Sequence, residues 1–284
     1  MKLVTIDYGC GTSSSILDYG IEDVVIVSET NYDHVFNVKD DLLFIGHDFL
    51  FFLWDNEEKI NKWINRKDKW QHWVWCFERI DAIVPEWKQK SHYSLSILGN
   101  FCKRILACDE DDCTNYGIDW LPQWASPKFF YDRNIEPYNE GIIFSGQAGK
   151  PEYHSRNVLL KSLLDDVGTK DLIKISNTHR SFSWEEYVQN LLSYKEVLNP
   201  VGILKAMNTR AYEALYSGRF LYQHQVDEYK RHMSLFDDDE GVYFFSDISS
   251  LKSCISKKKK LNPQKSFEKN SIYSRMNSIG VKIK

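Results

Sequence analysis

The chain has 284 residues, which is enough for one large domain or two of ordinary size with a substantial buried core. Its hydrophobic content of 43%, charged content of 27% and net charge of −4 are typical of an ordinary soluble globular protein. No apolar run approaches the roughly 20 residues that cross a bilayer. The opening MKLVTIDYG lacks the longer apolar stretch of a secretory signal, so we expect a cytoplasmic protein. The six cysteines form no C-x-x-C pair, which predicts neither a zinc site nor a disulfide framework.

The first half of the chain alternates strand-like and helix-like segments. Its apolar runs are too continuous for half-exposed strands and predict a parallel sheet covered on both faces. These runs are LVTIDYG (3–9), DVVIVSE (23–29), DLLFIGHD (41–48) and RILACDE (104–110). Between residues 54 and 78, the spacing of four aromatic residues near three, four and seven predicts a helix. IDWLPQWASPKFF (118–130) carries two prolines and predicts an extended connector.

The second half repeats this alternation from residue 141 onward. Its predicted strands are GIIFSGQ (141–147), DLIKIS (171–176), EVLNP (196–200), RFLYQ (219–223) and GVYFFS (241–246). Ser183 and Glu186 form a capping box that starts a helix over residues 183–195. Strands that alternate with helices of 10 to 15 residues indicate repeated βαβ units. The sequence therefore predicts an α/β fold with two Rossmann-like doubly wound domains, 1–135 and 136–284, facing a central cleft that binds a ligand.

The segment NPVGILKAMNTRAYEALYSGRFLYQ (199–223) carries the most specific functional pattern. Asn208 is a good N-cap for a helix from Thr209 to about Ser217, which Gly218 ends. The free N–H groups at such a helix start favour an anion, commonly a phosphate. Arg210 in the first turn opposes the helix dipole unless an anion binds there. The alternative is an ordinary surface pair of Arg210 with Glu213.

This segment resembles the C-terminal domain of GT-B fold glycosyltransferases of group 1, the group that includes spore-maturation-protein-B-like enzymes. The similarity lies in Asn208, Arg210, Glu213-Ala214 and Ser217-Gly218, followed by an apolar strand and the later run from Val242 to Leu251. Upstream, IIFSGQ (142–147) with Arg156 is similar to the opening of the family's donor domain. CFERID (76–81), RILACDED (104–111) and residues 118–130 are similar to the end of its acceptor domain. The resemblance covers most of residues 76–251.

The resemblance implies a nucleotide-sugar donor, UDP-linked in our expectation, and no other cofactor. Glu213 would bind the ribose hydroxyls from a helix start near the cleft, outside the core. Asn208 and Thr209 at the helix start would face the diphosphate, with Arg210 close by. Gly146 and Gln147 would form the loop after the donor domain's first strand. Lys150 and Arg156 are the cationic candidates for the phosphates. Fixed cations and N–H dipoles can stabilise a departing diphosphate without a metal, and the sequence shows no metal-ligand spacing. Related retaining enzymes carry a second Glu eight positions before the helix Glu. Here that position is Lys205, so the stereochemical outcome stays open.

The turn DYGCGTSSS (7–15) after the first strand is rich in glycine and serine. It lacks G-x-G-x-x-G and the P-loop lysine, which argues against nucleoside triphosphate binding. We expect Gly9 and Gly11 at the mouth of the cleft. Asp7 and Glu78 are the candidate catalytic bases, although an acidic residue at a strand end is often structural.

Residues 250–284 hold ten Lys and Arg against Glu268 alone, a net charge of +9 on an otherwise acidic chain. Six tryptophans between residues 54 and 87 are interleaved with further lysines and arginines. Aromatic faces with cations suit sugars or unstacked bases, and together with the basic tail they keep open a nucleic-acid acceptor, such as a hydroxymethylated base in viral DNA. The alternatives are a solvated terminal helix and a buried helix face, with a glycan or protein as acceptor. A non-catalytic nucleotide-sugar or nucleic-acid binding module on the same fold is the rival from another class. The oligomeric state is not predicted.

Overall fold

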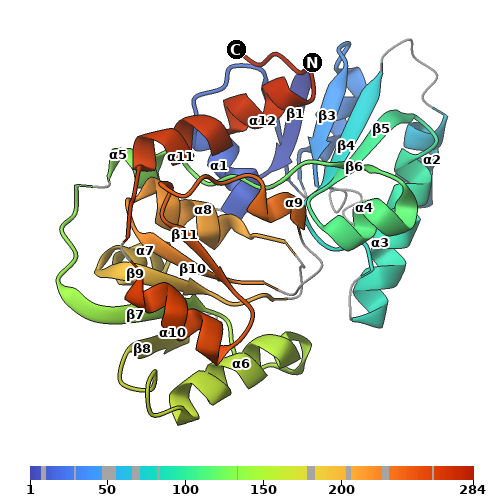
Figure 1. Ribbon diagram of the computed structural model, residues 1–284. Helices are drawn as coiled ribbons and strands as arrows, with labels where there is room; N and C mark the ends of the chain where they lie inside the picture. The colour runs from blue at the N-terminus through green and yellow to red at the C-terminus, as the bar shows by residue number, and fades with distance from the viewer. Residues whose placement is uncertain are drawn as a thin grey trace. The chain divides into compact units, whose positions relative to one another are not determined.

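The computed structural model (Figure 1) describes residues 1–7, 11–28, 30–46, 56–65, 71–81, 84–132, 134–177, 183–202, 206–225, 230–257 and 259–284. These residues form two compact units. The first unit comprises Met1–Gln123 together with Ile272–Lys284, and the second unit comprises Trp124–Ser271. No described helix is both long enough and apolar enough to cross a membrane.

The first unit is built on a six-stranded sheet with the order β2-β1-β3-β4-β5-β6, in which all neighbours are parallel. The strands are β1 (Lys2–Ile6), β2 (Val24–Val27), β3 (Leu42–Ile45), β4 (His72–Cys76), β5 (Cys102–Ala107) and β6 (Asp119–Trp120). Continuous apolar runs fill β1 and β3 because helices cover both faces of the sheet. The helical segments are α1 (Gly11–Asp18), η1 (Tyr32–Asn37), α2 (Glu57–Ile64), α3 (Pro85–Leu98), α4 (Glu110–Tyr116) and α12 (Ile272–Ser278).

The helix predicted between residues 54 and 78 is wrong over its second half. The described part of that range contains α2 and then β4, the strand HWVWC in the middle of the sheet. Val74 and Cys76 face one core cluster, and Trp75 between them is fully buried and donates its indole N–H to the Leu121 carbonyl oxygen at 2.8 Å. A strand buried on both faces carries large residues at every position, so the aromatic spacing fitted a helix equally well.

The C-terminal residues Ile272–Lys284 belong to the first unit, although the predicted division at 135/136 placed them in the second domain. Ile272 and Met276 of α12 are fully buried. The Tyr273 ring meets the Tyr19 ring edge to face, with centroids 5.7 Å apart. The Arg104 guanidinium donates to the Ile279 carbonyl oxygen at 3.2 Å. The chain therefore returns to complete a core that its first residues began.

The second unit contains a five-stranded parallel sheet with the order β11-β10-β9-β7-β8. Its strands are β7 (Asn139–Gly146), β8 (Ile173–Asn177), β9 (Tyr194–Asn199), β10 (Phe220–His224) and β11 (Val242–Phe245). Its helical segments are α5 (Lys128–Tyr131), η3 (Pro151–Tyr153), α6 (His154–Asp165), α7 (Trp184–Leu192), α8 (Thr209–Tyr216), α9 (Lys230–Met233), α10 (Ile248–Ser256) and α11 (Pro263–Asn270).

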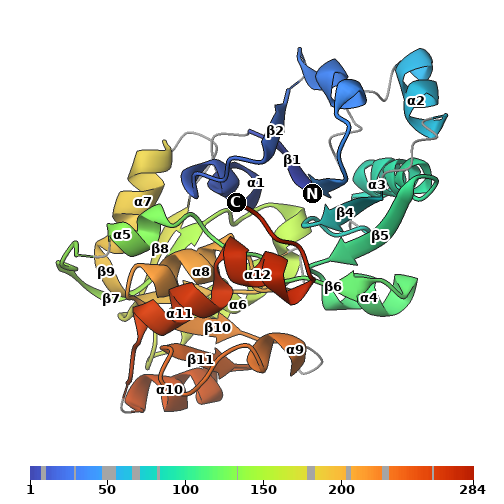
Figure 2. The ribbon, with the colours of Figure 1, turned by 90° about the horizontal axis from the view of Figure 1, so that it is seen from above.

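Alternate residues of each strand serve two separate cores in this unit. Ile143, Val197 and Leu221 pack with α5, α7 and α8 on one face, where α11 lies against α8 (Figure 2). Ile142 and Phe144 belong to the core on the other face, which α6 and α10 cover. Both units are thus doubly wound, and the predicted α/β class with two Rossmann-like domains is confirmed.

Candidate anion-binding site

The strand order of the second unit places its topological switch point between β7 and β9. Chain order runs outward from β7 to β8 on one side and to β9, β10 and β11 on the other. The helix that follows β7 is α6, and the helix that follows β9 is α8, and these two helices cover opposite faces of the sheet. In doubly wound folds this arrangement opens a crevice at the carboxyl ends of the strands, where ligands bind.

Arg210, in the first turn of α8, extends toward the carboxyl end of β7 from one face of the sheet. Its Nη1 donates to the Asn199 Oδ1 at 3.1 Å, and its guanidinium lies 5.1 Å from the centroid of the Phe144 ring. Gly146 ends β7 beside it. A Cβ at position 146 would collide with the Arg210 Nη2, so glycine is required for this close approach.

Arg156, in the first turn of α6, extends toward the carboxyl end of β7 from the other face of the sheet and is only 5% exposed. Its Nη1 donates to the Gln147 carbonyl oxygen at 2.7 Å, and its guanidinium lies 5.6 Å from the centroid of the same Phe144 ring. Gly202 leaves room for it, since a Cβ there would collide with the Arg156 Nη2. Burial and then the positive charge of Arg210 lower the pKa of Arg156 to about 9.

The two guanidinium groups are therefore close like charges whose acceptors are neutral. The acceptors are an amide oxygen for Arg210 and a peptide oxygen for Arg156. The Nε atoms of both arginines and the Ser145 Oγ are buried without a hydrogen-bond partner among the described residues. Burying these polar groups without hydrogen-bond partners costs free energy, which a ligand that accepts from them would recover. An anion with several oxygens fits because it supplies both negative charge and acceptors.

Glu213 lies one turn further along α8 and is 3% exposed, which corrects the expectation that it lies outside the core. Its carboxylate accepts a hydrogen bond from the Tyr187 hydroxyl of α7. Burial raises the pKa of Glu213 to about 7, although the Tyr187 hydroxyl and the charge of Arg210 act to lower it. The Glu213 carboxyl group therefore interacts electrostatically with the Arg210 guanidinium.

No protein-family model matches this chain, and no curated protein matches it. Among solved structures, the chain is similar to an alpha-glucosyltransferase in complex with UDP and a 13-mer DNA containing a central A:G mismatch. The two share 9% sequence identity over 98% of this chain and 92% of that chain, with a TM-score of 0.49. We therefore infer the function of this protein from the residues of its own site.

The structure brings together four of the residues predicted for the donor site. Gly146, Gln147, Arg156 and Arg210 converge on the switch point, as the contacts above show. Asn208 occupies the N-cap position of α8, but its side chain makes no capping hydrogen bond and its Oδ1 is buried without a hydrogen-bond partner among the described residues. Thr209 is the first residue of α8.

Lys150 is not among the residues that contact the arginine pair. Its Nζ lies 3.9 Å from the Glu152 Oε1, and its carbonyl oxygen accepts from the Asn157 Nδ2. The Asn157 Oδ1 accepts from the N–H of Gly149, which has a positive φ of 88°. Asn157 therefore links two neighbouring residues of the loop after β7 through their backbones, Gly149 and Lys150.

The candidate bases lie in the first unit. Asp7 is exposed immediately after β1, and Glu78 is exposed two residues after β4. Asp7 follows the carboxyl end of β1 and Glu78 follows that of β4, and β3 lies between these two strands in the sheet. Gly11 begins α1, whereas Gly9 lies outside the described residues, as does Lys205.

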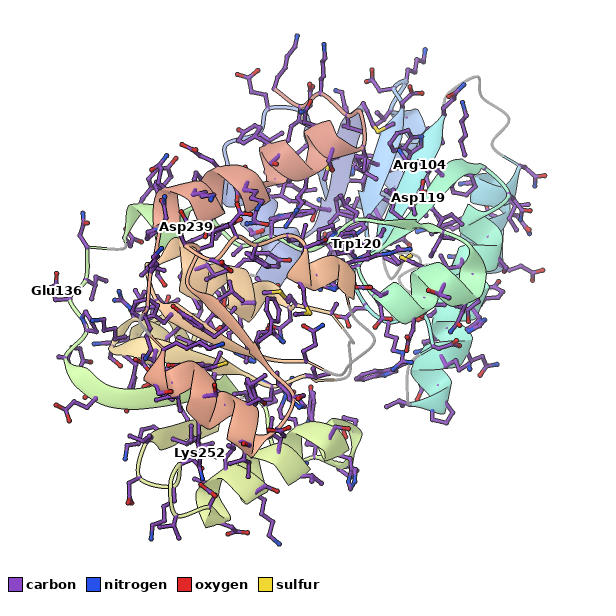
Figure 3. All side chains as sticks on the ribbon, viewed as in Figure 1. Arg104, Asp119, Trp120, Glu136, Asp239 and Lys252 are labelled. Carbon is purple, nitrogen blue, oxygen red and sulfur yellow. The ribbon has the colours of Figure 1, made fainter. Side chains whose placement is uncertain are left out.

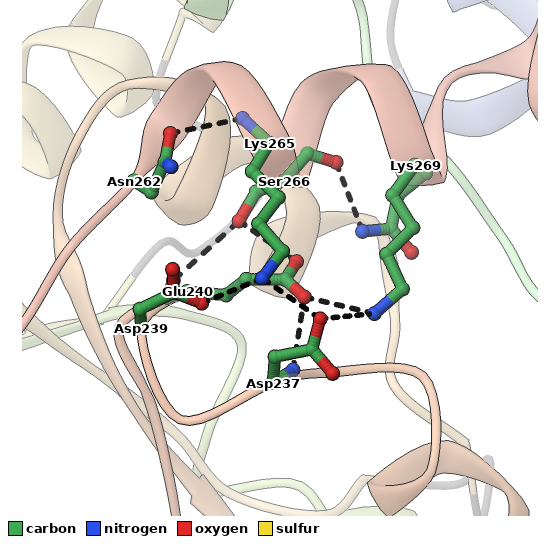
Figure 4. A network of polar contacts seen from close by, with 8 residues as sticks. Asp237, Asp239, Glu240, Asn262, Lys265, Ser266 and Lys269 are labelled. Atoms are coloured by element: carbon green, nitrogen blue, oxygen red, sulfur yellow. Dashed lines mark hydrogen bonds and ion pairs between the residues drawn. The ribbon is translucent and has the colours of Figure 1, made fainter.

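Part of the cationic C-terminal segment is engaged within the protein. Lys252 pairs with Asp166 at 2.8 Å, and Lys259 contacts Glu196. Lys265 and Lys269 of α11 form a network with three acidic residues of the second unit, Asp237, Asp239 and Glu240 (Figure 4). Lys257 and Lys260 are exposed. Four of the ten basic residues behind the predicted DNA contact are therefore bound to carboxylates.

Several residues of the site were not predicted from the sequence. Phe144 and Tyr187 were placed only within a strand and a helix, and Asn199 and Gln223 were seen as strand ends. The only signal for the two amides was their position at the carboxyl ends of neighbouring parallel strands. Among the described residues, no group of three or more His, Cys, Asp or Glu side chains is arranged to hold a metal ion.

Proposed function

We propose that the second unit binds the diphosphate of a nucleotide-sugar and that the protein is a glycosyltransferase. The observation that carries this proposal is the pair of guanidinium groups from opposite faces of the sheet, Arg156 and Arg210, which meet at the switch point and donate to a peptide oxygen and an amide oxygen. Two phosphates joined by one bridging oxygen can accept from both guanidinium groups at once. The resemblance of residues 199–251 to GT-B donor domains points to the same ligand.

The same pair suits the chemistry of sugar transfer. When the bond between the sugar and the diphosphate breaks, negative charge grows on the leaving phosphate oxygen. Cations already fixed in position stabilise this charge without reorganising during the reaction. Glu213 would bind the ribose hydroxyls, and Asp7 or Glu78 would take the proton of the acceptor hydroxyl. We further propose that the arginines make a metal unnecessary, which transfer in the presence of a chelator would test.

Calorimetric titration with UDP tests the donor site. Arg156→Met and Arg210→Met should each weaken UDP binding roughly 10- to 100-fold, because each removes charge-assisted hydrogen bonds worth about 1.5–3 kcal/mol. Arg104→Met is the matched control: it removes an arginine of the first unit that contacts Asp119 (Figure 3) and should leave UDP binding unchanged. Unchanged UDP binding in both site variants would refute the proposal.

Thermal unfolding without ligand separates a ligand role from a structural one. If the two arginines hold the fold together, each methionine variant should melt at a lower temperature. If they serve an anion, Arg156→Met should leave the melting temperature unchanged or raise it, because it removes one of two close like charges. Arg210→Met also leaves the buried Asn199 oxygen without its donor, so the comparison rests on Arg156→Met.

A binding module without catalytic activity would share this site. Release of UDP from UDP-sugars distinguishes the two hypotheses, since a module binds the donor and leaves it intact. A protein that binds UDP tightly but releases none from any UDP-sugar, with or without acceptor, would favour the module.

DNA is the acceptor that we propose to test first, and Lys257 and Lys260 are two exposed lysines of the cationic segment with which to test it. Each phosphate contact made by a lysine on duplex DNA contributes about −0.9 to the slope of log affinity against log salt. Lys257→Ser with Lys260→Ser should therefore make the slope less steep by at most about two. Lys265→Ser with Lys269→Ser, the internally paired control, should change it less. Absence of a gel shift at about 50 mM salt would leave a glycan, protein or small-molecule acceptor.

A further inference from the structure

Two buried amide side chains connect Arg210 to the backbone of β10. Asn199 and Gln223 occupy the same register position on the neighbouring strands β9 and β10, and they are 1% and 3% exposed. The Asn199 Nδ2 donates to the Gln223 Oε1 at 2.7 Å, and the Gln223 Nε2 donates to the His224 carbonyl oxygen at 2.8 Å. The Arg210 Nη1 donates to the Asn199 Oδ1 at 3.1 Å.

The chain of hydrogen bonds has a fixed direction. A peptide carbonyl oxygen can only accept, so the Gln223 amide must turn its NH₂ group toward His224. Its oxygen then faces Asn199, whose own NH₂ group must donate to it. The Asn199 oxygen is left pointing at position 210, where only a donor can satisfy it. The carbonyl oxygen at the end of β10 thereby determines that a donor occupies position 210.

An amide and a carboxylate at position 199 differ in whether they compensate the positive charge of the Arg210 guanidinium. A carboxylate at position 199 would hold the guanidinium equally well but would neutralise its charge. An amide oxygen orients the guanidinium and leaves the positive charge available to an anion. Burial makes the orientation strict, since a rotated amide would leave a donor and an acceptor unsatisfied away from water.

We propose that Asn199 and Gln223 are positioning residues that orient Arg210 toward the diphosphate without neutralising it. This inference rests on the proposed function, because it presupposes that Arg210 binds the donor phosphates. It assigns a role to two strand-end residues that contact the ligand only through another side chain.

A double-mutant cycle with UDP as the probe tests the proposal. Asn199→Asp should raise the dissociation constant of UDP about tenfold or more, because the new carboxylate pairs with Arg210. Arg210→Met should raise it by a similar or larger factor. A second cycle pairs Arg210→Met with Asn199→Leu, which removes the amide without adding a charge, and this double variant should bind no more weakly than Arg210→Met alone. A merely structural role would instead give independent, additive losses.

The other outcomes distinguish failure of the positioning role from failure of the proposed function. Unchanged UDP binding in Asn199→Asp, or additive losses in the double variant, overturns the positioning role and leaves the proposed function standing. Failure of the unsubstituted protein to bind UDP overturns both. If Asn199→Asp does not fold, as judged by thermal unfolding, Gln223→Met enters the same cycle, because it frees the Asn199 amide to rotate.

Discussion

A glycine at position 146 allows an arginine from one face of the sheet to reach an aromatic ring that belongs to the opposite face. Arg210 comes from α8, whereas Phe144 packs with α6 and α10. The crossing is feasible only where the strand end carries no side chain. A substitution at this glycine therefore acts on the arginine, and no cavity is made in either core.

Gly146→Ala should weaken UDP binding at least tenfold while the protein remains folded, because the added methyl group displaces the Arg210 guanidinium. Calorimetric titration with circular dichroism checks both parts. Gly168→Ala is the matched control, since its Cβ would meet the Lys252–Asp166 ion pair, which lies away from Arg210. Equal UDP affinity in the two variants would show that the close approach of Arg210 is not needed.

Glu213 makes the stability of the protein depend on pH near neutrality. Burial raises its pKa from the usual 4.5 to about 7, so between these values the folded state holds a proton that the unfolded state has lost. Its contribution to stability is fully present below pH 4.5 and is lost as the pH rises through 7. The free energy of unfolding should fall by up to roughly 3 kcal/mol across this range.

Glu213→Gln removes this titration and keeps the shape of the side chain. Urea unfolding at pH 5 and pH 8 should therefore show a smaller loss of stability for Glu213→Gln than for the unsubstituted protein. Identical losses in the two proteins would mean that the carboxyl group has an ordinary pKa in the folded state.

At the scale of helices and strands, the sequence predicted elements best where one local signal determined them. Ser183 and Glu186 form the predicted capping box of α7, and α8 runs from Thr209 to Tyr216 with Gly218 at a positive φ of 71°. The strand β4 was missed because burial on both faces removes the polar alternation that distinguishes a strand from a helix. The amide pair depends on the register between strands, which no local pattern contains.

Helix α11 is held to the second unit by charge as well as by packing. The Glu240 side chain is fully buried, and its carboxylate accepts from the Lys269 Nζ at 2.9 Å and from the Ser266 Oγ at 3.2 Å. Phe267 on the same helix stacks on Phe130 of α5, with centroids 4.4 Å apart. The lysines of this helix therefore serve the fold, which their sequence position in a cationic segment did not reveal.

Lys269→Met should lower the free energy of unfolding by about 1–3 kcal/mol, because it leaves the buried Glu240 carboxylate without its cation. Lys265→Met should cost less than about 1 kcal/mol, since its partners Asp237 and Asp239 are exposed to solvent. Urea unfolding of both variants makes the comparison. A larger effect at position 265 would contradict this account of the network.

At the scale of the whole molecule, the sequence predicted the class and the two doubly wound units but not the path of the chain between them. The alternation of strands and helices is a local property, so it was visible. The return of the C-terminus to the first unit depends on contacts such as Tyr273 with Tyr19, which join residues far apart in the sequence. The predicted cleft between the domains stays a prediction.

Removal of residues 272–284 should therefore destabilise the first unit and leave donor binding to the second unit intact. The truncated protein exposes the surface that Ile272 and Met276 bury. Thermal unfolding should show an earlier transition that UDP does not shift, while calorimetry should give an unchanged UDP affinity. Met276→Ala is a milder variant that should destabilise the protein by about 2–5 kcal/mol. Weakened UDP binding in the truncated protein would contradict the assignment of donor binding to the second unit alone.

The two-part composition of the first unit also has a consequence for synthesis. Proteins generally fold domain by domain from the N-terminus as the ribosome extends the chain. Here the second unit is complete at Ser271, whereas the first unit still lacks α12. The first unit is thus completed only after the second, and its apolar surface stays uncovered until α12 leaves the ribosome. A nascent chain stalled near residue 271 should accordingly be a target for chaperones that recognise exposed apolar surface.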